Sequence, residues 1–163
     1  MKRRSTARWI CEVGIIAAMY AVLTIFLAPI SFGQVQFRVA EVLMILPFFT
    51  PSAIPGLFIG CLIANTVGSS FGLLDIVAGS LATLAAAAIA SRIKIKWLVP
   101  LPTVLVNAVV VAYILYAMAG LPYLISAACV GLGEAVVCFG LGMPLLYLLD
   151  RYKNRIFPQT LDK

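Results

Sequence analysis

Apolar stretches of roughly 20 residues, the length that spans a bilayer as a helix, follow one another along almost the whole chain. Hydrophobic residues make up 63% of the 163 residues and charged residues 11%, and the mean hydropathy is +1.09. A soluble globule of this size cannot enclose so much apolar surface. The sequence therefore predicts an all-α integral membrane protein without room for a soluble catalytic domain.

The apolar stretches predict six transmembrane helices in a single domain, residues 1–163. The expected helices cover residues 10–30, 39–50, 54–69, 73–91, 97–118 and 122–149. The stretch 39–67 contains three prolines and fits either one kinked helix or two short ones. If it crosses twice, the basic clusters at 92–96 and 151–155 both lie in the cytoplasm, as the positive-inside rule requires. We therefore expect a multi-pass protein of the cell membrane, with a short or tilted second helix and both termini cytoplasmic.

One stretch, 31–49 (SFGQVQFRVAEVLMILPFF), places polar residues directly before an apolar run. It contains Gln34, Gln36, Arg38 and Glu41. Arg38 and Glu41 are three residues apart, so in a helix they share a face and can pair. The pair is either an anchor at the membrane border or the rim of a polar pocket.

Four further polar residues, Asn65, Asp75, Asn107 and Glu134, lie within or at the ends of the later apolar stretches. Asp75 falls in the first turn of its helix, where the helix dipole alone would explain a carboxylate. Glu134 falls near the middle of the membrane, where an ionisable group is costly and usually faces a cavity or a partner. With the polar stretch described above, these residues predict one cavity that opens outward. A channel would need polar residues along its whole path, and the inner half of the expected helices has almost none.

The sequence lacks the groups that catalysis would need. It contains no histidine, no GxSxG motif and no phosphate-binding GxxxxGK[ST] loop. Cys11, Cys61, Cys129 and Cys138 lie in apolar segments without a CxxC pair, which is typical of small core residues and not of disulfides or metal ligands. We therefore expect no enzyme activity, no catalytic residue, no cofactor, no metal and no nucleic-acid partner. A partner protein must supply the energy for any uphill transport.

Small residues are spaced for close helix packing in the first and third helices. Ala17 and Ala21 are four residues apart in the first helix, and Gly56 and Gly60 have the same spacing in the third. The ridge on the first helix either packs against a sister helix or docks to another protein.

Two runs, GQVQFRVAEVLMILPFFTPSAIPGLFIGCLIAN and LLDIVAGSLATLAAA, closely resemble the QueT family, the queuosine-precursor S components of energy-coupling factor (ECF) transporters. The resemblance spans most of the chain, and its QFRxxExLxxLPFF core distinguishes this family from other S components. It implies a six-helix, ECF S-component-like fold that captures a 7-deazaguanine, such as pre-queuosine or queuine, from outside.

The resemblance also implies partners: a membrane-embedded coupling subunit and two cytoplasmic ATPase subunits, with substrate released inward as the S component topples in the bilayer. In the family an AxxxA motif on the first helix meets the coupling subunit. Here that motif falls on Ala17 and Ala21, which favours docking over packing.

The substrate class fits the residues chemically. A carboxylate can accept the adjacent N–H donors of a guanine-type edge, and Gln, Asn or Arg can meet its carbonyl. Glu41, Asp75 and Glu134 give the expected pocket more acidic groups than the single Arg38 can neutralise. This surplus suits a cation, such as the aminomethyl group of one queuosine precursor, but it also suits thiamine-like vitamins. The residues expected to bind substrate are Gln36, Arg38, Glu41, Asn65, Asp75, Asn107 and Glu134. An S component for another vitamin or nucleobase, and a non-transporting subunit whose polar residues lock helices together, are the alternatives.

Overall fold

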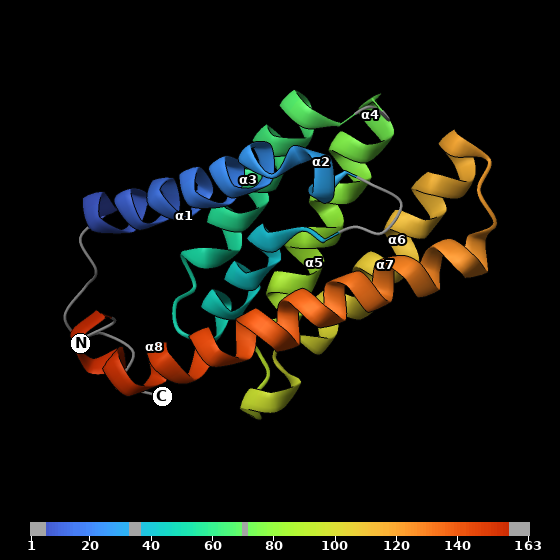
Figure 1. The fold of residues 1–163 in the computed structure, drawn as a ribbon. Coiled ribbons are helices and arrows are strands. Elements are labelled where there is room, and N and C mark those ends of the chain that lie inside the picture. Colours follow the sequence, from blue (N-terminus) through green and yellow to red (C-terminus); the bar gives the residue numbers. More distant parts are fainter. Residues whose placement is uncertain (1–5, 33–36, 70–71, 157–163) are drawn as a thin grey trace.

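The computed structural model describes residues 6–32, 37–69 and 72–156, with the side chain of residue 154 excepted. Every regular element in these ranges is helical, which confirms the all-α fold (Figure 1). The elements are α1 (Thr6–Phe26), α2 (Ala28–Ser31), the 3-10 helix η1 (Val39–Phe48), α3 (Ala53–Gly68), α4 (Gly72–Leu74), the π-helical turn η2 (Asp75–Gly79), α5 (Ser80–Ala90), the 3-10 turn η3 (Lys96–Leu98), α6 (Leu101–Ala119), α7 (Tyr123–Val137), the π-helical turn η4 (Cys138–Gly142) and α8 (Met143–Ile156).

Within the described ranges, four helical stretches are long and apolar enough to cross a membrane: Thr6–Phe26, Gly72–Ala90, Lys96–Ala119 and Tyr123–Lys153. The other two apolar helices are shorter. The 10 residues of η1 extend about 20 Å at the 3-10 rise of roughly 2.0 Å per residue. The 16 residues of α3 extend about 24 Å at 1.5 Å each, against a hydrocarbon core of about 30 Å. Six crossings therefore remain a prediction.

Helix η1 lies at the centre of the fold, where it contacts α1, α3, α5, α7 and α8 (Figure 1). Seven of its 10 residues are buried, so it packs against neighbouring elements on nearly all sides. The sequence predicts an α-helix over 39–50, whereas the structure has the tighter 3-10 form. Pro47 lies inside it and offers no N–H, and the N–H of Phe49 bonds to the carbonyl of Leu46, three residues back. The 3-10 pitch therefore persists to the end of the helix.

Helices α1 and α3 pack at close range through the glycines of α3. A Cβ atom added at Gly60 would lie 2.7 Å from the carbonyl oxygen of Ala17 and 2.8 Å from Cβ of Tyr20. One added at Gly56 would lie 2.9 Å from Cβ of Ile16. This geometry confirms the close packing that the spacing of the two glycines predicts.

The turn between η1 and α3 lies beside the first half of α1. Glu12 on α1 accepts hydrogen bonds from the hydroxyls of Ser52, at 2.7 Å, and of Thr50, at 3.3 Å. The chain therefore leaves the far end of α1, passes through α2 and returns along η1 toward the end of the bundle where α1 begins (Figure 1).

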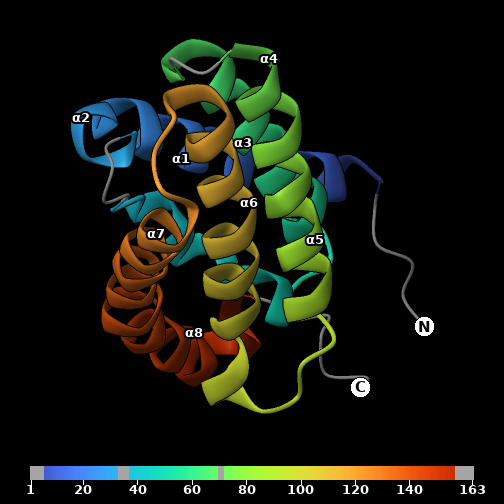
Figure 2. The same ribbon diagram turned by 90° about the vertical axis from the view of Figure 1, so that its right-hand side faces the viewer.

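The second half of the chain forms a row of neighbouring helices in which α3 contacts α5, α5 contacts α6, and α6 contacts α7 (Figure 2). Gly120 ends α6 in the left-handed conformation, with φ of 67°, and Pro122 precedes α7. Helices α7 and α8 continue into each other through η4 as one long curved helix (Figure 1). Lys96 of η3 donates to Asp150 of α8 at 2.7 Å, so the two basic segments lie at the same end of the bundle.

Candidate functional site

Arg38 and Glu41 lie at the start of η1, where Arg38 is the N-cap residue and Glu41 is in the first turn. Nη1 of Arg38 lies 4.0 Å from Oε1 of Glu41, which confirms the pairing that their spacing predicts. Their side chains are 2% and 0% exposed, so the pair is fully buried and not at a surface rim. The guanidinium also lies 5.3 Å from the ring centroid of Phe32, within cation–π range.

Tyr20 extends the pair to α1. Its hydroxyl donates a hydrogen bond to Oε1 of Glu41, and the tyrosine has no exposed surface. The sequence pattern does not single out Tyr20. The available signal was a tyrosine within an apolar segment, because a buried phenol hydroxyl usually finds a hydrogen-bond partner.

Glu134 on α7 and Asn107 on α6 form a second buried pair. Nδ2 of Asn107 donates to Oε1 of Glu134 at 3.0 Å, and the thiol of Cys138 lies 3.7 Å from Oε2. The thiol of Cys138 also lies 3.8 Å from the backbone carbonyl of Glu41, which connects α7 to η1. Their positions along the apolar segments predict a similar depth in the membrane for Glu134 and Asn107, and the structure brings the two side chains into contact.

Asn65 and Asp75 meet at the junction of α3 and η2. Nδ2 of Asn65 donates to the backbone carbonyl of Asp75 at 3.2 Å, and the hydroxyl of Ser69 donates to the Asp75 carboxylate at 2.5 Å. A Cβ atom at Gly79 would lie 2.9 Å from Nδ2 of Asn65 and 3.0 Å from Oδ1 of Asp75. Gly79 therefore leaves the space that these two side chains occupy.

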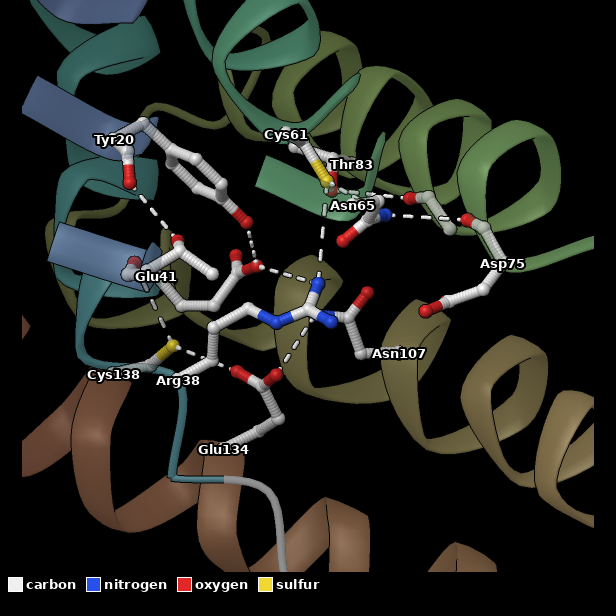
Figure 3. A network of polar contacts seen from close by, with 12 residues as sticks. Tyr20, Arg38, Glu41, Cys61, Asn65, Asp75, Thr83, Asn107, Glu134 and Cys138 are labelled. Atoms are coloured by element: carbon white, nitrogen blue, oxygen red, sulfur yellow. Dashed lines mark hydrogen bonds and ion pairs between the residues drawn. The ribbon is translucent and has the colours of Figure 1, made fainter. Parts of the chain in front are cut away.

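Cys61 on α3 connects these two parts of the network. Its sulfur accepts from the hydroxyl of Thr83 at 3.2 Å and from Nδ2 of Asn65 at 3.5 Å, and Nη1 of Arg38 lies 4.0 Å away. Figure 3 shows the resulting cluster, with the guanidinium of Arg38 between the carboxylates of Glu41 and Glu134.

Several buried atoms of this network have no hydrogen-bond partner among the described residues: Nε and Nη2 of Arg38, Oε2 of Glu41 and Oδ1 of Asn65. A buried polar atom that stays unpaired is costly, and such atoms are rare in folded proteins. The network thus has two donor groups and two acceptor atoms to offer to a ligand.

The structure places six of the seven expected binding residues in one network, on η1, α3, η2, α6 and α7. They are Arg38, Glu41, Asn65, Asp75, Asn107 and Glu134. The seventh, Gln36, and its neighbour Gln34 lie outside the described residues. No cluster of three or more candidate metal ligands occurs in the described ranges.

The four cysteines are free thiols, but they do not share one environment. Cys61 and Cys138 are buried and belong to the network, whereas Cys11 is exposed and Cys129 is half-buried. The expectation that all four are core residues is therefore wrong for Cys11 and Cys129, because α1 and α7 turn those positions away from the bundle centre.

Ala17 and Ala21 are buried inside the bundle, at 5% and 7% exposed, and Ala17 lies against Gly60 of α3. Of the two alternatives for the small residues of the first helix, this position agrees with packing inside the bundle. The exposed face of α1 carries different side chains: Ile15, Met19, Val22 and Phe26.

Comparison with known proteins agrees with the resemblance in the sequence. The profile of the QueT transporter family matches residues 10–151. The queuosine precursor transporter QueT of Lactococcus lactis subsp. cremoris (strain MG1363) is 39% identical over 84 residues, which are 50% of this chain and 48% of that protein. The match therefore spans about half the length of that relative. No solved structure matches the chain. Because the family profile extends over nearly all of the apolar segments, the chain belongs to the QueT transporter family.

Proposed function

We propose that this chain is the substrate-binding S component of an ECF-type importer. It captures a queuosine precursor, a 7-deazaguanine, from outside the cell and delivers it inward with a membrane-embedded coupling subunit and two cytoplasmic ATPase subunits. Family membership and the printed name of the Lactococcus lactis relative support this substrate class. The absence of a phosphate-binding loop from the sequence supports an external ATPase.

The observation that carries the proposal is the buried network itself. A guanine-type base presents a ring carbonyl beside N–H donors. Nε and Nη2 of Arg38 can donate to the carbonyl, while Oε2 of Glu41 and Oδ1 of Asn65 can accept from the N–H groups. Phe32 beside the guanidinium offers an aromatic face to a planar ring. Asp75, Asn107, Glu134 and Gln36 complete the proposed site.

Ligand entry requires the network to open, because Arg38 and both of its glutamate neighbours are sealed from solvent. The cost of separating these groups is offset when the ligand satisfies the unpaired donors and acceptors. A purely structural network would gain nothing from leaving four groups unpaired. This difference favours a binding site over a non-transporting subunit.

For the orientation in the membrane we propose six crossings of one transmembrane domain, with both termini in the cytoplasm. The contact between Glu12 and Ser52 supports a turn near residues 50–52 on the same side as the start of α1. The contact between Lys96 and Asp150 supports a common side for the two basic segments. The short helices η1 and α3 would then be the second and third crossings.

The coupling role of Ala17 and Ala21 belongs to the same proposal. Both residues are buried in this structure, and Ala17 lies against Gly60 of α3, so they can meet a coupling subunit only when α1 moves away from its neighbours. The alternative contact surface is the exposed apolar face of α1.

A binding titration with a matched uptake assay tests the proposal. The purified chain in nanodiscs is titrated calorimetrically with 7-aminomethyl-7-deazaguanine, guanine and thiamine, and uptake is measured in cells with and without the coupling and ATPase subunits. We expect the isolated chain to bind the deazaguanine most tightly and uptake to require the partners. Preference for another vitamin or nucleobase would contradict the substrate class. Absence of any binding, or uptake without ATPases, would contradict the S-component role.

A further inference from the structure

The two buried glutamates of the network have different electrostatic partners. Glu41 lies 4.0 Å from the guanidinium of Arg38 and accepts the hydroxyl of Tyr20. Glu134 hydrogen-bonds only to neutral groups, the amide of Asn107 and the thiol of Cys138, although the Arg38 guanidinium lies nearby beyond ion-pair distance. Among the described residues, no basic side chain lies within 4.0 Å of the Glu134 carboxylate.

The position of Glu134 in its helix supplies no compensating charge. It lies within the long helix formed by α7, η4 and α8, well away from the N-terminus at Tyr123. The favourable effect of a helix dipole on an anion is confined to the first turn. Asp75 differs, because it follows the start of α4 by three residues and accepts the hydroxyl of Ser69.

The charges at the centre of the network do not balance. Ionised Glu41, Asp75 and Glu134 share a single guanidinium, that of Arg38, so the buried network carries a surplus of negative charge. A desolvated carboxylate without a cation is strongly unfavourable, so this site gains most from a ligand that brings one positive charge. Figure 3 shows the Glu41 carboxylate above and the Glu134 carboxylate below the Arg38 side chain, so a ligand can meet the two carboxylates with different groups.

We propose that Glu134 is the counter-ion of a cationic substituent on the ligand, and that Arg38 and Glu41 recognise the neutral edge of the base. This inference rests on the proposed function and adds which carboxylate meets which part of the substrate. The ligand is a base that carries a primary ammonium group on a short arm. The ammonium donates to the Glu134 carboxylate, while Arg38 Nε and Nη2 donate to the ring carbonyl and Glu41 Oε2 accepts a ring N–H.

The test uses two ligands that differ only in the cation: 7-aminomethyl-7-deazaguanine and 7-deazaguanine. Both are titrated calorimetrically into the full chain in nanodiscs, as wild type, Glu134→Gln and Glu41→Gln. We expect Glu134→Gln to weaken binding of the aminomethyl base about 30-fold or more, the effect of losing a buried charge partner, and that of the amine-free base less than about 3-fold. Glu41→Gln serves as the matched control and should weaken both ligands to the same degree.

A second variant covers the case in which Glu134→Gln does not fold. Glu134→Asp keeps the charge, and we expect it to retain the wild-type preference for the aminomethyl base. Equal losses for both ligands in Glu134→Gln, or a loss confined to the aminomethyl base in Glu41→Gln, would overturn the assignment. Absence of binding of either base to the wild type would overturn the proposed function as well, so the two failures are distinguishable.

Discussion

The hydroxyl of Tyr20 donates a 2.5 Å hydrogen bond to Oε1 of Glu41, 21 residues further along the chain. Both side chains are fully buried, and the bond joins α1 to the start of the central helix η1. Because Oε1 also faces Arg38, the tyrosine determines which oxygen of Glu41 stays available to a ligand. Tyr20 is therefore a positioning residue of the proposed site.

Replacement of this tyrosine by phenylalanine tests that role. Tyr20→Phe removes the donor and leaves the ring, so Glu41 loses its fixed orientation. We expect the affinity for both deazaguanines to fall about 10-fold, as for a lost hydrogen bond to a charged group. Calorimetric titration measures the change. Thr24→Val is the control, because its hydroxyl is equally buried on α1 but bonds only to the backbone carbonyl of Tyr20. Equal effects of the two variants would contradict the positioning role.

The close approach of α1 to α3 predicts that Gly60→Ala is destabilising. The new methyl group would lie within 2.8 Å of Ala17 and Tyr20, so the two helices must move apart. We expect the free energy of unfolding to decrease by about 1 to 3 kcal/mol, as for other overpacked cores. Gly14→Ala provides the comparison, since a Cβ atom there would meet no atom within 4 Å. Thermal unfolding of both variants in detergent measures the difference, and equal midpoints would argue against a tight interface.

The proposed orientation predicts which loops an impermeant thiol reagent reaches from outside the cell. In a cysteine-free background, which is needed because Cys11 is exposed, Leu124→Cys should react in intact cells and Lys94→Cys only after permeabilisation. Helix α6 separates the two positions, since Lys94 precedes it and Leu124 lies in the first turn of α7, and both native side chains are exposed. Reaction of Lys94→Cys in intact cells would rule out six crossings with a cytoplasmic N-terminus.

The sequence predicts the parts of the site that depend on local spacing or on depth in the membrane. The pairing of Arg38 with Glu41 follows from a separation of three residues, and the burial of Glu134 follows from its place in a long apolar segment. The hydrogen bond from Asn107 to Glu134 could not be predicted, because it depends on how α6 and α7 rotate about their axes. The hydropathy of a segment does not depend on that rotation.

The sequence pattern does not identify Tyr20 or Cys61 as part of the site, for the same physical reason in both cases. Tyr20 and Cys61 are both compatible with an apolar helix, so neither interrupts the hydropathy pattern. Their polar atoms acquire a role only through tertiary contacts, with Glu41 in one case and with Thr83 and Asn65 in the other. The 3-10 pitch of η1 was missed for a similar reason. After Glu41 the segment is apolar at every position, so it carries no periodicity from which its pitch could be read.

The 3-10 geometry of η1 restricts how its length can change. Side chains three residues apart are stacked in such a helix, and each residue adds about 120° of rotation and about 2.0 Å of length. One residue inserted between Glu41 and Pro47 would thus rotate the Arg38 side of the helix by about a third of a turn against the rest of the bundle. Three inserted residues would restore the facing side but add about 6 Å, which the contact between Glu12 and Ser52 cannot absorb. The distance along the chain from Arg38 to Ser52 therefore acts as a molecular ruler, which admits substitutions far more readily than insertions or deletions.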